Sequence, residues 1–182
     1  MNTEELEQLK FPIGIYNIPE SITSENIKQW IEDIEAFPEV IHKLTKDLTT
    51  EELSWKYRPN GWSIKQVVHH CVDSHMNSII RFKLALTEDN PTIRPYFEDR
   101  WAKLDVGKEN DLRDSIQLLM ALHSKLGKLL RSISKEDMSR TFQHPEYGRL
   151  FRIDETIGNY AWHGKHHAAH IKQALNYKGV FD

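Results

Sequence analysis

Apolar residues recur at alternating spacings of three and four along several long segments of the chain, the pattern of helices that each bury one face. The first segment covers residues 24–48, and Pro38 inside it is expected to kink this helix or to split it in two. A later segment covers residues 112–133. The apolar positions of these two segments are Ile27, Trp30, Ile34, Phe37, Ile41, Leu44 and Leu48, then Ile116, Leu119, Leu122, Leu126, Leu129 and Leu130.

Two further helices are indicated by periodicity together with signals for their ends. One begins at "GWSIKQV", where Ser63 followed by Gln66 has the pattern of a capping box, and it continues through Leu86. The other is predicted to begin with Asp154 as its N-cap and to end around residues 177–179, where a glycine stops it.

The segments between these helices carry information about the topology. Residues 88–110 are too long for a tight antiparallel turn, so they can cross the bundle and let the second and third helices run parallel. Residues 134–153 hold two short apolar–polar stretches around a turn, which favours a small hairpin. The sequence therefore predicts an all-α protein, a four-helix bundle forming one domain over residues 1–182.

Composition excludes several classes of function. The chain has 182 residues, 39% of them hydrophobic, a net charge of −3 and no dense stripe of Lys and Arg, so we expect no nucleic-acid partner. It has no apolar run of membrane-spanning length and no apolar core of a signal peptide, so we expect a cytoplasmic protein without a membrane partner. The single cysteine, Cys71, excludes an internal disulfide, and its helical spacing from Val67 and Val68 favours a core residue over a nucleophile.

Histidine is the unusual residue of this chain. Of its ten histidines, seven lie in the two stretches "VVHHCVDSHMN" and "WHGKHHAAHI". They are His69, His70, His75, His163, His166, His167 and His170. Two clusters so far apart suggest one site assembled by folding, and the alternative is a pair of hydrated helix faces that are rich in histidine.

Helical geometry orders the histidines of the second cluster. At about 100° per residue, His163 and His167 lie one turn apart at the edge of the apolar stripe, where their imidazoles can bind one metal ion together. His166 and His170 have the same spacing but are expected to face more toward solvent. The pair His163 and His167 is therefore the predicted half of a metal site.

A third ligand has to come from the first cluster, because two histidines bind a divalent ion incompletely. His75 is close to the middle of the apolar stripe and is expected to be a hydrogen-bonded core histidine or a supporting contact. His69 and His70 lie on opposite flanks of that stripe, and periodicity does not choose between them. A ferritin-type di-iron site fits poorly, because the paired Glu-x-x-His motifs that it needs are missing.

Three stretches resemble one protein family. They are "FPIGIY", "YRPNGWSIKQVVHHCVDSHMNSIIRFKLALTEDNPTIRPY" and "YAWHGKHHAAHI", and from about residue 11 to residue 175 they are similar to the YfiT group of the DinB-like superfamily. The resemblance implies an up-down-down-up four-helix bundle, a homodimer, and a divalent metal, zinc or nickel, bound by His70, His163 and His167. It also implies a metal-dependent hydrolase, or a thiol S-transferase that uses bacillithiol or a similar small thiol.

Three neutral imidazoles with an open position are typical of catalytic metal sites. Such a site activates water or holds a thiolate, and the absence of a glutamate after His163 favours the thiolate. Asp73 and His170, each about one turn beyond a ligand, are the candidates to orient a ligand or move a proton. We therefore expect a small-molecule thiol or a small hydrolysable substrate as the partner, and the alternative is a non-catalytic metal- or ligand-binding stress protein.

Overall fold

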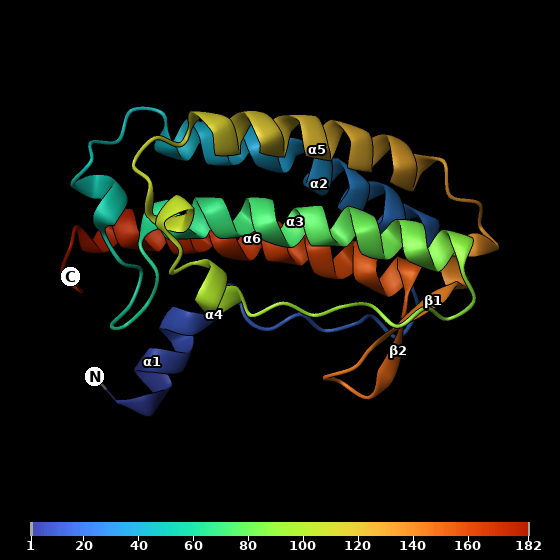
Figure 1. Ribbon diagram of the computed structural model, residues 1–182. Helices are drawn as coiled ribbons and strands as arrows, with labels where there is room; N and C mark the ends of the chain where they lie inside the picture. Colours follow the sequence, from blue (N-terminus) through green and yellow to red (C-terminus); the bar gives the residue numbers. More distant parts are fainter. Residues whose placement is uncertain (1, 182) are drawn as a thin grey trace.

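Four long helices dominate the computed structural model, which describes residues 2–181 (Figure 1). They are α2 (Ser24–Thr45), α3 (Ile64–Thr87), α5 (Arg113–Arg131) and α6 (Ile153–Tyr177). The shorter elements are α1 (Thr3–Lys10), η1 (Glu52–Ser54), α4 (Glu98–Trp101), η2 (Asp105–Lys108), η3 (Asp137–Ser139), β1 (Thr141–His144) and β2 (Arg149–Arg152). None of the described helices is long and apolar enough to cross a membrane.

The four long helices form a bundle in which α2 and α3 are diagonal to each other. Both α2 and α3 pack against α5 and against α6. Figure 1 shows α3 and α5 running in one direction and α2 and α6 in the other, because the connection from α3 to α5 returns along the bundle. The predicted four-helix bundle with a long crossover and up-down-down-up order is thereby confirmed.

Pro38 does not split its helix, so the expectation of two separate helices is wrong. Helix α2 continues as an α-helix from Ser24 to Thr45 with Pro38 inside it. Phe37 and Ile41, on either side of the proline, are both buried in the same apolar cluster. Packing on both sides therefore holds the two halves together in one helix.

The two predicted helix starts have different outcomes. Ser63 is the N-cap of α3, and its backbone N–H donates to Oε1 of Gln66 over 3.1 Å, as the capping box requires. At α6 the predicted N-cap, Asp154, is wrong, because Arg152 takes that position. Strand β2 leads directly into the helix there, and the carboxylate of Asp154 accepts the backbone N–H of Glu155 over 2.8 Å from inside the first turn.

The predicted hairpin is present and anchors the long crossover. Strands β1 and β2 pair antiparallel, with Phe142 opposite Phe151. Gln143 also binds the crossover, because its backbone N–H donates to the carbonyl of Pro91 over 2.9 Å and its carbonyl accepts from Ile93 over 3.0 Å. The crossover is thus fixed along the same side of the bundle as the hairpin.

A layer of imidazoles interrupts the apolar core. One buried cluster includes Phe37 and Cys71, and a second includes Phe82 and Leu126. Burial raises the pKa of the Cys71 thiol, as expected for a core residue rather than a nucleophile. Two fully buried histidines, His75 of α3 and His123 of α5, fall between these clusters along their helices.

Candidate metal centre

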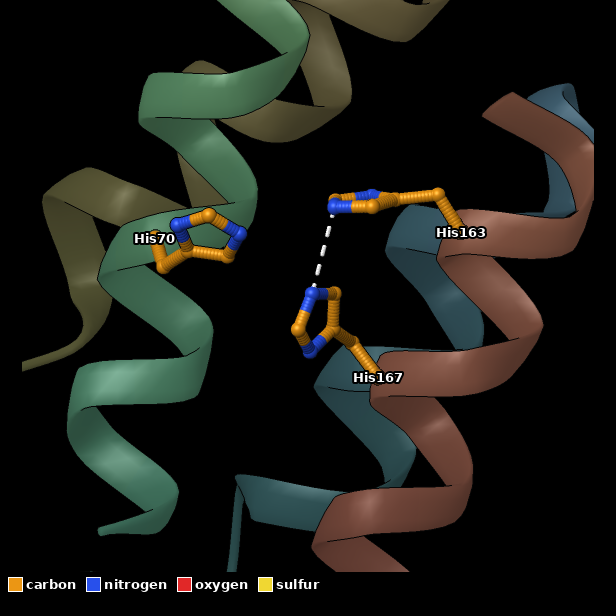
Figure 2. A group of neighbouring side chains, drawn as sticks. All are labelled: His70, His163 and His167. Carbon is orange, nitrogen blue, oxygen red and sulfur yellow. Dashed lines mark hydrogen bonds between the residues drawn. The ribbon is translucent and has the colours of Figure 1, made fainter. Parts of the chain in front are cut away.

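The structure brings His70, His163 and His167 together from two helices. Helices α3 and α6 are antiparallel neighbours, so an early turn of α3 faces a late turn of α6. Figure 2 shows the three side chains pointing toward one another across the gap between the helices. One ring nitrogen of each lies within 4.8 Å of the other two, so the three residues could hold one metal ion.

The adjacent residue His69 faces away from this group. Its Nε2–H donates to the carbonyl of Glu109 over 3.0 Å, since a carbonyl only accepts. Its Nδ1 then accepts from the hydroxyl of Ser115 over 2.8 Å. With both nitrogens of His69 occupied, only His70 of this pair reaches the cluster.

A chain of hydrogen bonds fixes which nitrogen of His163 is free. His123 Nδ1–H donates to the carbonyl of Ile34 over 2.5 Å, so its Nε2 accepts from His75 Nδ1–H over 2.7 Å. His75 Nε2 is then the acceptor for His163 Nδ1–H, over 3.0 Å. A neutral His163 therefore keeps a lone pair on Nε2, the atom that faces His167.

The carbonyl at the end of this chain is available because of Pro38. In an α-helix the N–H of residue i donates to the carbonyl of residue i−4, and proline has no N–H. Pro38 therefore leaves the carbonyl of Ile34 without its helical donor, and His123 supplies one instead. A residue that looks like a helix breaker in the sequence thus creates a buried acceptor.

His167 has one proton and two possible acceptors for it. Its Nε2 lies 3.1 Å from His163 Nε2, and its Nδ1 lies 3.4 Å from His170 Nδ1. His170 Nδ1 is a free acceptor, because His170 Nε2–H donates to the carbonyl of Lys10 over 3.0 Å. With the proton on Nδ1, the Nε2 lone pairs of His163 and His167 face each other at close to the ~3.3 Å that separates two nitrogens on a tetrahedral zinc ion.

A second group of ring nitrogens, from His166, His167 and His170, is also close enough to hold a metal ion. His167 belongs to both groups, and a neutral imidazole has only one lone pair in the ring plane to donate. The two groups therefore exclude each other unless His167 loses both protons. His163 presents its lone pair to Nε2 of His167, which favours the group that contains His70.

The expected exposure of His166 and His170 is wrong. Their exposed fractions are only 7% and 2%. The ring of His166 stacks on Trp162 at 4.5 Å between centroids, and that of His170 stacks on Tyr57 at 3.8 Å. Periodicity locates a residue relative to its own helix, whereas the N-terminal segment covers these faces. The ring of Phe11 lies 5.9 Å from that of His166 between centroids, and the carbonyl of Lys10 accepts from His170.

Comparisons with known proteins show the family of the chain. A family model described as the DinB superfamily matches residues 33–171. The chain belongs to the DinB superfamily. The resemblance drawn from the three sequence motifs is thereby confirmed.

Relatives within the DinB superfamily are similar over nearly their whole length. Two proteins named "Putative metal-dependent hydrolase", from Bacillus cereus (strain 03BB102) and Halalkalibacterium halodurans, are 49% and 45% identical over 166 residues, covering 91% of this chain and 95% and 96% of theirs. YfiT from Bacillus subtilis, described as "a probable metal-dependent hydrolase with an unusual four-helix bundle topology", has a TM-score of 0.91 at 41% identity, covering 94% of this chain and 98% of its own.

The mycothiol-dependent maleylpyruvate isomerase shares the fold, with a TM-score of 0.63 at 14% identity, covering 80% of this chain and 60% of its own.

The imidazoles of this DinB-superfamily site are neutral near pH 7. Burial, with the nearby His166, lowers the pKa of His70 to about 4. Burial also holds the pKa values of His163 and His167 well below the ordinary value, and the neighbouring histidines add to the effect. Neutral imidazole is the form that binds a metal ion, so no proton has to leave before binding.

The site opens into a cavity of about 470 Å³. Trp62, Tyr96 and Tyr160 contribute aromatic walls, and side chains of both charges complete the lining. His170 lines the cavity, whereas Asp73 does not. Asp73 is partly buried elsewhere on α3, where burial raises the pKa of its carboxyl, so the geometry brings only one of the two predicted assisting residues to the site.

Two residues near the site were not predicted from the sequence. His123 lies four residues after Leu119 and three before Leu126, so its place on the buried stripe of its helix was a usable signal. Arg81 also lines the cavity, and nothing in its local sequence distinguishes it from a solvated arginine. The first could have been found from spacing, and the second needed the fold.

Proposed function

We propose that this chain is a metal-dependent enzyme whose ligands are His70, His163 and His167, and that its physiological co-substrate is a small-molecule thiol. The observation on which this rests is the meeting of two unshared Nε2 lone pairs, 3.1 Å apart, beside a third imidazole in an open cavity. Imidazole ligands suit both zinc and nickel. Zinc is the favoured ion, because three protein ligands with an open position are typical of catalytic zinc sites, and nickel is the alternative.

The residues around the ligands prepare neutral donors. His75 accepts the Nδ1 proton of His163 and so directs the Nε2 lone pair of His163 toward the site. His170 accepts the proton of His167 at Nδ1, which releases Nε2 of His167. The ion, when bound, supplies a Lewis acid that keeps a thiol ionised or lowers the pKa of a water molecule.

Two features favour a thiol over water: the charge of the ion and the lack of a carboxylate base beside the ligands. Three neutral ligands leave the double charge of the ion undiminished, which favours an anionic fourth ligand such as a thiolate. Among residues 2–181, no carboxylate forms a hydrogen bond with any of the three imidazoles, so a carboxylate base for water is missing from their immediate contacts. In the proposed transfer the thiolate sulfur bonds to the electrophilic carbon of a small molecule, and the leaving group departs with the bonding electrons.

Metal content tests the ligand assignment. We expect about one zinc or nickel ion per chain, and at least a 100-fold loss of affinity in His163→Ala and in His167→Ala. The matched control is His69→Gln, a neighbour of His70 whose side chain points away from the site. Inductively coupled plasma mass spectrometry and competition with a chelating dye give both quantities, and full metal retention in His163→Ala would contradict the assignment.

A paired assay tests the reaction. The metal-loaded protein is given an alkylating electrophile with and without a low-molecular-weight thiol, and separately given ester and amide substrates. Thiol-dependent turnover that His70→Ala abolishes supports transfer. Thiol-independent turnover of esters or amides would establish hydrolysis, in line with the names of the relatives, and binding without any turnover would favour a non-catalytic metal-binding protein.

A further inference from the structure

Arg81 is a partly buried cation without a partner of opposite charge. Among residues 2–181, no carboxylate oxygen lies within 4.0 Å of its guanidinium. One of its terminal nitrogens donates to the hydroxyl of Tyr160 over 3.3 Å, and its Nε is buried without a hydrogen-bond partner. A buried N–H of a charged group costs free energy when it stays unpaired. The Arg81 side chain lines the cavity, so an anion that enters the cavity and reorients the guanidinium would relieve this cost.

A second side chain of the same cavity also has an unpaired nitrogen. His144, at the end of β1, is 8% exposed, and its Nδ1 is buried without a partner. His144, Arg81, Tyr160 and Asn159 all line the cavity that contains the three histidines. The hydroxyl of Tyr160 donates to the carbonyl of Ser74 over 3.5 Å while it accepts from Arg81, so Tyr160 holds the guanidinium in place. Arg81 and Asn159 supply hydrogen-bond donors, and Arg81 adds one full positive charge, which together suit a planar anion.

Arg81 and Tyr160 lie on the same two helices as the three histidines, farther along the cavity. Arg81 comes eleven residues after His70 on α3, about three turns, and therefore lies on nearly the same face. Tyr160 precedes His163 on α6, with ring centroids 5.9 Å apart. Side chains on a helix lean toward its N-terminus, which tilts Arg81 back toward His70. A molecule bound at Arg81 would thus extend along the cavity to the histidines.

We propose that Arg81, held in place by Tyr160 and assisted by His144, binds a carboxylate group of the molecule that reacts at the three histidines. The planar guanidinium matches a carboxylate, and one arginine balances one negative charge. The placement of the other end of this molecule at the three histidines rests on the proposed function. Binding of the carboxylate by Arg81 does not require a metal ion.

The first test uses metal-free protein, so it is independent of the proposed reaction. The Nε–H signal of Arg81 is assigned in ¹⁵N NMR spectra by its loss in Arg81→Gln, and succinate or propionate is then titrated. We expect a saturable shift in the millimolar range for both carboxylates and none for propionamide, which has nearly the same shape without the charge. No saturable shift with either carboxylate, or an equal shift with propionamide, would overturn the proposal.

The second test links the carboxylate site to the metal site. Cobalt-substituted protein is titrated with 3-mercaptopropionate and with its uncharged amide, and binding is followed by the thiolate-to-cobalt absorption band. We expect the carboxylate to bind at least about tenfold more tightly, an advantage that Arg81→Gln removes and Arg81→Lys partly restores. Arg113→Gln, which removes a charge outside this cavity, should keep the advantage.

The outcomes separate the two proposals. An undiminished preference for the carboxylate in Arg81→Gln would overturn the assignment of Arg81. If neither thiol produces the band, the proposed thiol chemistry fails, and the NMR titration still decides whether Arg81 binds carboxylates.

Discussion

The two proposed metal ligands on α6 are supported from opposite directions. His163 is held from inside the bundle, through His75 and His123 to the carbonyl of Ile34. We call this series the inner path. His167 is held from outside the bundle, through His170 to the carbonyl of Lys10, and we call this series the outer path.

The two paths differ in their effect on the packing of the core and in the elements on which they depend. The inner path replaces apolar side chains with imidazoles in the core, where every ring nitrogen must find a partner. His75 and His123 are therefore as much a part of the packing as of the site. The outer path ends on α1, an element outside the bundle, so it depends on how that segment is seated. A metal ligand that is fixed from the core should be more sensitive to substitution than one fixed from the periphery.

His75→Ala should have the largest effect, because it breaks the inner path in the middle. It leaves a cavity and removes the partners of His163 Nδ1–H and of His123 Nε2, so we expect a loss of about 3–5 kcal/mol in the free energy of unfolding. Metal affinity should fall by about 10- to 100-fold, as for other groups that orient a metal ligand. Urea denaturation and dye competition measure the two effects separately.

The control for that experiment is His75→Gln, whose amide supplies both a donor and an acceptor. It should recover part of the metal affinity relative to His75→Ala. Unchanged metal affinity in His75→Ala, despite lower stability, would show that the inner path is structural only.

Much of the fold could be predicted because its determinants are local. Apolar spacing places the four long helices, and the capping box at Ser63 gives the start of α3. The start of α6 was misplaced at Asp154, since the local sequence does not show that the second strand of the hairpin leads into the helix without an intervening turn. Along the chain, connection length predicted the crossover, because a 23-residue segment from 88 to 110 cannot be a tight turn.

The site was harder to predict, because its support is assembled from several elements. The one-turn spacing of His163 and His167 and the central position of His75 on its stripe are readable from the sequence. By contrast, the choice of His70 required a family resemblance, since both flanks of α3 carry a histidine. The role of Pro38 could not be read at all, because it depends on a histidine from another helix reaching the freed carbonyl.

His170→Ala should have a smaller effect, because it breaks the outer path where the N-terminal segment covers α6, and not inside the bundle. His167 then loses the acceptor for its Nδ1 proton, and we expect about a tenfold loss of metal affinity. The free energy of unfolding should fall by only about 1–2 kcal/mol, since one hydrogen bond to Lys10 and one ring stack are lost. Thermal or urea unfolding beside the His75→Ala variant gives the comparison directly, and equal destabilisation by the two variants would contradict the distinction between the paths.

Pro38→Ala should have the smallest effect and the most specific one. Alanine restores an N–H that competes with His123 for the carbonyl of Ile34, so the inner path weakens at its far end while α2 gains a hydrogen bond. A carbonyl has two lone pairs, so the competition is partial, and we expect metal affinity to fall only a few-fold, by about 1 kcal/mol or less. The free energy of unfolding should stay the same or rise, because proline is the poorest helix former.

The matched control is Glu39→Ala, an exposed change at the next position, which should leave metal affinity unchanged. Loss of packing alone does not lower metal affinity while the free energy of unfolding stays the same or rises. A lower free energy of unfolding with unchanged metal affinity would show that Pro38 has no part in the inner path.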